Sequence, residues 1–189
     1  MERRAFIKHT AAVASVSAVP GLTNAMSNVV PTASVQCHNT LVLVDERFSD
    51  SRRFAAAFAA RGATVLSLDE DIGRLWYRDL RRECAAAHTR IAGLTLHTDL
   101  FISQVFARDL HRTLLEFGVH DCRGRQSLTH TLPSNSQLDL RSSEAWAAEV
   151  ANALLEGKGS GRLLDGVTQA STITRAVDHP GTLYSWLII

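Results

Sequence analysis

Short apolar runs alternate with amphipathic stretches through the first two thirds of the chain, and this alternation constrains the fold most strongly. The predicted strands are 41–44, 63–68, 91–94 and 119–122. The predicted helices begin at Ser49 or Asp50, at Asp69, and at Thr98 or Asp99. The run 41–44 is continuously apolar, which is typical of a strand buried on both faces of a sheet. Apolar residues in the intervening segments recur at helical spacing.

This order predicts an α/β fold, because a parallel pair of strands needs a helical crossover between them. We expect a mainly parallel sheet with helices on both faces, in three layers, of Rossmann or flavodoxin type. Strand 41–44 should lie in the middle of a 2-1-3 order. After Gly124 we expect a half-exposed strand around Leu128–Leu132 and a helix that carries Trp146, Val150 and Leu154.

The chain ends in an apolar strand, Thr182–Ile189, which we expect to be added to the same sheet. Such an end must be covered, either by the sheet or by a protein partner that docks on it. Gly157–Gly161 is glycine-rich and predicts a flexible internal linker.

Several single positions carry local expectations. Phe54 and Phe58 stack on one helix face, and Gly62 ends that helix. Gly93 lies inside a strand and indicates close packing, and Gly118 is expected to end the third helix. The row Ile72, Trp76, Leu80 and Cys84 is expected to be the buried stripe of the second helix, and Ile102, Phe106, Leu110 and Leu114 that of the third.

The first 25 residues have the organisation of an export signal. Arg3, Arg4 and Lys8 form a basic start, an uncharged Ala- and Val-rich stretch follows, and small residues allow cleavage after Ala25. Arg3-Arg4 with Phe6 and Lys8 resembles the twin-arginine (Tat) signal, although Glu precedes the arginines where Ser or Thr is favoured. The resemblance implies that the Tat translocation machinery carries the folded chain to the periplasm or outside the cell.

These features divide the chain into a signal peptide at 1–25, a flexible lead-in at 26–39 and one α/β domain at 40–189. No second apolar segment is long enough to span a membrane. The chain has 20 Lys and Arg against 19 Asp and Glu, with no basic block, which excludes a nucleic-acid-binding protein. Cys37, Cys84 and Cys122 form no CxxC pair, so no metal site is predicted, and their disulfide pairing stays open.

Polar side chains follow the first and third strands, where an open α/β sheet binds ligands. The candidate ligand-binding residues are Asp45, Arg47, Ser49, Thr95, His97 and Thr98. The candidate catalytic residues are His97 with Asp45 or Glu46, because a carboxylate beside an imidazole supports acid–base chemistry. Ser49 and Thr98 are equally explained as helix caps. His120 and Asp121 end the fourth strand and could join the same rim.

Two functions remain open. The first is an exported accessory or small-ligand-binding protein that takes a small anion at this site or escorts a co-exported redox enzyme. The second is a small periplasmic hydrolase or transferase that uses the His–carboxylate pair. No nucleotide fingerprint, P-loop or nucleophile elbow occurs, so no cofactor is predicted.

Overall fold

The computed structural model describes residues 38–68, 71–84, 88–123, 127–133, 136, 138–140, 145–157, 168–174 and 181–189. The predicted signal peptide, its cleavage point, the lead-in up to residue 37 and linker residues 158–161 lie outside these residues. The elements of the first half, in chain order, are β1 (Thr40–Val44), α1 (Ser49–Ala59), β2 (Thr64–Ser67), α2 (Ile72–Leu75), the π-helical turn η1 (Trp76–Leu80), α3 (Arg81–Cys84), β3 (Arg90–Leu96) and α4 (His97–Asp109). Those of the second half are β4 (Leu114–Arg123), β5 (Ser127–Pro133), α5 (Trp146–Leu155), β6 (Thr168–Thr174) and β7 (Gly181–Ile188).

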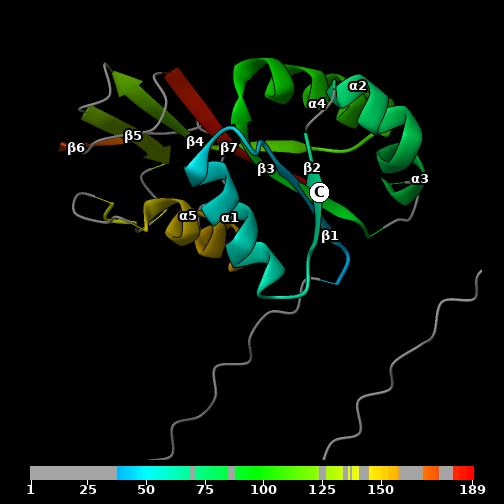
Figure 1. The fold of residues 1–189 in the computed structure, drawn as a ribbon, viewed down its shortest axis with the longest axis horizontal. Coiled ribbons are helices and arrows are strands. Elements are labelled where there is room, and N and C mark those ends of the chain that lie inside the picture. Colours follow the sequence, from blue (N-terminus) through cyan, green and yellow to red (C-terminus); the bar gives the residue numbers. More distant parts are fainter. Residues whose placement is uncertain are drawn as a thin grey trace, which may run out of the picture. The chain divides into compact units, whose positions relative to one another are not determined.

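The described strands form one seven-stranded mixed sheet in the order β2-β1-β3-β7-β4-β5-β6 (Figure 1). Strand β1 pairs in parallel with β2 and with β3, so the predicted 2-1-3 order is confirmed. Every other described strand pair is antiparallel. The chain therefore has an α/β fold, but the prediction of a mainly parallel sheet is wrong beyond β3.

The C-terminal strand β7 is part of the sheet, as predicted, and it lies in the centre. It pairs antiparallel with β3 on one side and with β4 on the other. The predicted fourth strand is the end of the longer β4, and β7 separates it from β3. Leu183, Trp186 and Ile188 are at most 1% exposed. The sheet itself thus covers the apolar end of the chain, while the last residue, Ile189, is half exposed.

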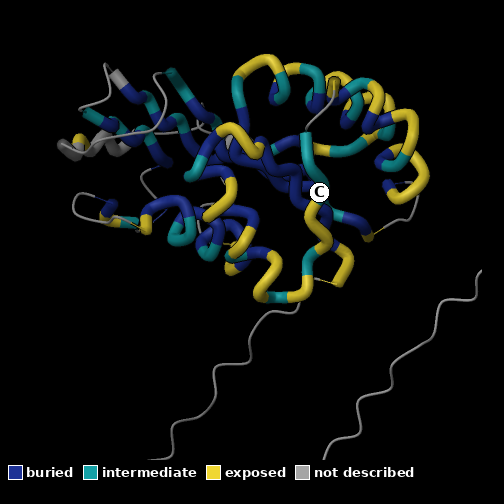
Figure 2. The backbone as a smooth tube through the Cα atoms, in the orientation of Figure 1, coloured by how far each residue is buried: buried dark blue, intermediate teal, exposed yellow. Residues whose placement is uncertain are grey.

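Helices pack on both faces of the sheet, and each face has its own apolar core (Figures 1 and 2). Helices α1 and α5 lie together on one face, where Val42, Phe54 and Trp146 are fully buried. The segment α2-η1-α3 and helix α4 cover the other face, with Leu43 and Trp186 in its core. Alternate residues of β1 and β3 point to the two cores, because successive strand side chains face opposite sides.

The first two helices follow the sequence pattern closely. The ring centroids of Phe54 and Phe58 lie 5.1 Å apart. Gly62 follows the end of α1 and has a positive φ of 87°. The predicted row at 72, 76, 80 and 84 is buried throughout. This second helix begins at Ile72, because Asp71 caps it by accepting the N–H of Gly73, at 2.8 Å, and its predicted end at residue 87 lies outside the described residues.

The end of the third helix differs from the prediction. Helix α4 ends at Asp109, and His111 makes the following turn with a φ of 55°. Leu114 therefore lies in β4, and the predicted stripe at 102, 106 and 110 is only half buried. Gly118 lies inside β4 beside a register shift, where a Cβ would sit 2.6 Å from Cδ2 of Leu132. Close packing, rather than the end of a helix, explains this glycine.

Candidate functional site

A pocket of about 420 Å³ opens where β1 and β3 end side by side. The loop after β1, the start of α2 and the first turns of α4 form its walls. Its lining residues are Asp45, Glu46, Arg47, Leu68, Asp71, Ile72, Thr98, Asp99 and Ile102. Of the predicted ligand-binding residues, Asp45, Arg47 and Thr98 line this pocket, and Glu46 lines it as well.

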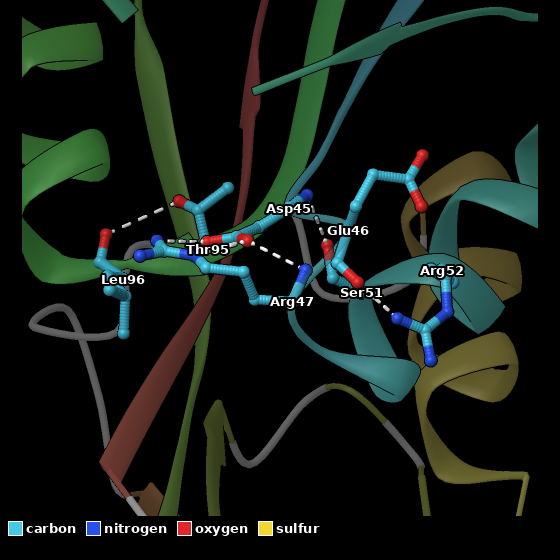
Figure 3. A network of polar contacts seen from close by, with 7 residues as sticks. All are labelled: Asp45, Glu46, Arg47, Ser51, Arg52, Thr95 and Leu96. Atoms are coloured by element: carbon cyan, nitrogen blue, oxygen red, sulfur yellow. Dashed lines mark hydrogen bonds and ion pairs between the residues drawn. The ribbon is translucent and has the colours of Figure 1, made fainter. Parts of the chain in front are cut away.

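The base of the site is a fixed ion pair between neighbouring loop residues (Figure 3). The side chain of Asp45 is 2% exposed and accepts from Nε of Arg47 at 2.8 Å and from Nη2 at 2.6 Å. The Arg47 backbone N–H also donates to Oδ1 of Asp45, at 3.1 Å. These contacts raise the pKa of Arg47, first through the hydrogen bond with Asp45 and then through its charge. Asp45 thus holds the guanidinium in one orientation, and Arg47 compensates a buried carboxylate.

Other contacts fix the loop itself. The Asp45 N–H donates to the hydroxyl of Ser51, at 3.0 Å, and the Phe48 N–H donates to the Asp45 carbonyl. Arg52 donates from Nη1 to the carbonyl oxygen of Glu46. Ser51, the third residue of α1, faces back toward the end of β1 and holds this loop (Figure 3). The predicted Ser49 does not line the pocket.

Carboxylates dominate the pocket walls. Asp45, Glu46, Asp71 and Asp99 line it together with one cationic side chain, Arg47. Burial raises the pKa of Asp99, the charges of Asp45 and Asp71 raise it further, and the charge of Arg47 opposes the shift. The small anion predicted from the sequence would meet four carboxylates and one guanidinium in this pocket.

His97 does not join the predicted carboxylates. It is the first residue of α4 and is exposed, and its ring meets the edge of Tyr184 with centroids 5.3 Å apart. Within the described residues, no hydrogen bond or ion pair joins His97 to Asp45 or Glu46, and His97 does not line the pocket. The reason is the position of β7, which pairs with β3 up to Leu96 and draws the following residue toward Tyr184.

Two further expectations have different outcomes. Thr95 is fully buried and does not line the pocket. Its hydroxyl accepts a hydrogen bond from Nε1 of Trp186 at 3.0 Å and donates one to the carbonyl oxygen of Leu96 at 3.3 Å, so Thr95 stabilises the sheet. The helix caps at Ser49 and Thr98 are wrong: the N-cap positions are Phe48 and Leu96, and neither forms a side-chain cap.

A second polar group, which the sequence pattern does not predict, lies in the core beneath α5. Nδ1 of His120 lies 2.8 Å from Nδ1 of His130, and Nε2 of His120 lies 2.9 Å from Oγ of Ser185. All three residues are at most 1% exposed, and both imidazoles pack against Trp146. Burial lowers the pKa of His120 well below its usual range, and the charge of His130 lowers it further. His120 therefore faces the core rather than the rim of the pocket.

The described part of the chain holds no group of three or more His, Cys, Asp or Glu side chains arranged to bind a metal ion. None of its helices has the length and apolar character needed to cross a bilayer. Cys84 and Cys122 are both buried, and Cys37 lies outside the described residues. No protein-family model, curated protein or solved structure matches this chain. Its function is therefore argued from the geometry of the pocket.

Proposed function

We propose that this chain is an exported protein that binds a small molecule in the pocket at the ends of β1 and β3. The topology supports this position for a ligand site. The chain leaves β1 toward β2 on one side and later returns to form β3 on the other. In doubly wound folds of Rossmann or flavodoxin type, ligands bind at such a reversal, outside the carboxyl ends of the strands. The parallel half of the sheet is proposed to work in the same way.

One observation carries the proposal: the pocket combines volume, fixed charges and apolar walls. The buried carboxylate of Asp45 holds the guanidinium of Arg47 in place. The guanidinium edge that Asp45 does not occupy therefore faces a ligand without rearrangement. Leu68, Ile72 and Ile102 supply apolar surface beside it. Fixed polar groups beside apolar surface in a preformed cleft are typical of small-molecule sites.

The export part of the proposal rests on the resemblance of residues 3–8 to a Tat signal, which places the protein in the periplasm or outside the cell. Escort of a co-exported redox enzyme has less support, because the apolar strand that suggested a docking surface is buried in the sheet. The hydrolase or transferase alternative has no supporting contact, because His97 packs on Tyr184 instead of on a carboxylate.

Native mass spectrometry of the full chain, purified from its source, tests ligand binding directly. We expect a non-covalent small-molecule adduct that is lost on mild denaturation. Ile102→Trp should abolish the adduct because Ile102 lines the pocket. Val105→Trp is the matched control, since Val105 is an exposed residue of the same helix outside the lining. An adduct that persists in Ile102→Trp would place the ligand elsewhere and refute the proposed site.

A further inference from the structure

The guanidinium of Arg47 has one edge occupied and one edge open. Asp45 takes Nε and Nη2, which form the side-on edge. A guanidinium has five N–H donors in a planar fork, so the end-on edge, formed by Nη1 and the second hydrogen of Nη2, can bind another carboxylate in bidentate fashion. The Arg47 side chain is 69% exposed and lines the pocket, so this edge is accessible to a ligand.

A ligand with only a negative charge is nevertheless a poor partner for this edge. Asp45 already offsets the charge of Arg47, and Asp71 and Asp99 lie on the walls of the same pocket. A carboxylate ligand that carried no positive group would be repelled by these side chains. A ligand with only a positive charge would be repelled by the guanidinium of Arg47.

Arg47 and Asp99 face a common space. Both side chains line the same pocket, and within the described residues no ion pair joins them. Each also perturbs the pKa of the other. A small group with a carboxylate and an ammonium on neighbouring atoms can therefore lie between them. Its carboxylate would meet the open edge of Arg47, and its ammonium would meet Asp99.

The apolar wall completes the ligand class. Leu68, Ile72 and Ile102 line the pocket next to these charges, and an aliphatic side chain of the ligand would be removed from water against them. We propose that the pocket binds a neutral aliphatic α-amino acid as a zwitterion, with Arg47 at its carboxylate, Asp99 at its ammonium and the apolar wall at its side chain. This inference rests on the proposed function and names the ligand class of the same site.

Isothermal titration calorimetry on the full chain at pH 7 tests the inference with three probes of nearly equal shape. L-leucine carries both charges, L-leucinamide lacks the carboxylate, and 4-methylpentanoate lacks the ammonium. Because each charged contact contributes about tenfold or more in affinity, we expect leucine to bind at least about tenfold more tightly than either analogue. Leucinamide that binds as tightly as leucine, or 4-methylpentanoate that does so, overturns the inference.

Two substitutions assign the charges to residues. Asp99→Asn should remove the preference for leucine over 4-methylpentanoate, while Asp109→Asn, an exposed position at the other end of α4, should leave it unchanged. Arg47→Lys should reduce the preference for leucine over leucinamide, because an ammonium cannot form the bidentate contact. Arg53→Lys is the matched control, since Arg53 also pairs with a buried carboxylate, Asp50, at 3.1 Å, but does not line the pocket.

The outcomes separate this inference from the proposed function. A retained adduct in native mass spectrometry that Ile102→Trp removes, without binding of leucine, overturns the amino-acid assignment and leaves the binding function standing. Absence of any adduct together with absence of binding by all three probes overturns both. Leucine binding that survives Ile102→Trp with its preferences intact overturns the assignment to this pocket.

Discussion

Gly93 is the position where one added methyl group should disturb the sheet most. It lies in β3, between β1 and the central strand β7, and the indole of Trp186 covers it. A Cβ at this position would lie 2.5 Å from Cζ2 and 2.7 Å from Cε2 of that indole. These atoms belong to a rigid ring that is fully buried, so the ring or the backbone must move. We predict that Gly93→Ala strongly destabilises the fold.

The magnitude follows from two costs and one gain. Overpacking a well-packed core by one methyl group costs about 1–3 kcal/mol. Displacing the indole also lengthens its bond from Nε1 to Thr95, now 3.0 Å, and a buried donor left without a partner costs about 1–3 kcal/mol. Replacing Gly by Ala in a strand returns roughly 0.5–1 kcal/mol of backbone entropy. The net loss is about 1–5 kcal/mol, which in a domain of this size lowers the melting temperature by roughly 2–20 °C.

Urea unfolding of the purified chain, followed by tryptophan fluorescence and circular dichroism, measures this loss. Gly73→Ala is the control: its Cβ would meet only the flexible Asp71 carboxylate, at 3.3 Å, and should change stability by less than about 1 kcal/mol. Adding Trp186→Phe to Gly93→Ala should recover part of the loss, since the smaller ring leaves room for the methyl group. Equal stability of Gly93→Ala and the parent chain, or no coupling between the two positions, would refute the packing argument.

Three shorter predictions follow from other parts of the chain. Replacing Arg3 and Arg4 by Lys should leave the precursor inside the cell in a fractionation assay, and normal processing of that variant would rule out the Tat assignment. His120 is held neutral in the folded state, whereas in the unfolded chain the same imidazole takes up a proton below about pH 6.5. The free energy of unfolding should therefore fall by about 1–2 kcal/mol between pH 6.5 and pH 5, and His120→Gln should flatten this slope in urea titrations. His97→Ala should change the melting temperature by less than about 2 °C, because His97 is exposed; a larger drop in a thermal scan would mark it as structural.

The parallel half of the sheet could be predicted from the sequence because its signals are local. The run Leu41–Val44 is apolar at every position and is buried at every position. Gly62 stops α1 where the helical pattern ends, and Asp45 and Arg47 follow directly after β1. The carboxyl end of a buried strand is fixed once the strand is found, so the floor of the pocket could be placed from sequence.

The walls of the pocket and the position of β7 could not be placed in this way. The sequence marks Asp99 only as a helix cap and gives no signal for Asp71, because no local pattern shows how α2 and α4 are placed relative to each other. The composition of β7 identifies a strand, but parallel addition at an edge and antiparallel insertion at the centre would bury the same side chains. Only its pairing with both β3 and β4, far away in sequence, decides between them.

The central strand β7 makes the parallel half of the sheet depend on a distant part of the chain. The last strand of the chain joins the parallel half, which carries the pocket, to the antiparallel half. Trp186 in this strand covers Gly93 and binds Thr95 at the end of β3, close to where the pocket begins. The parallel half that carries the pocket therefore completes its pairing only when β7 is in place, and contacts this distant in sequence form slowly.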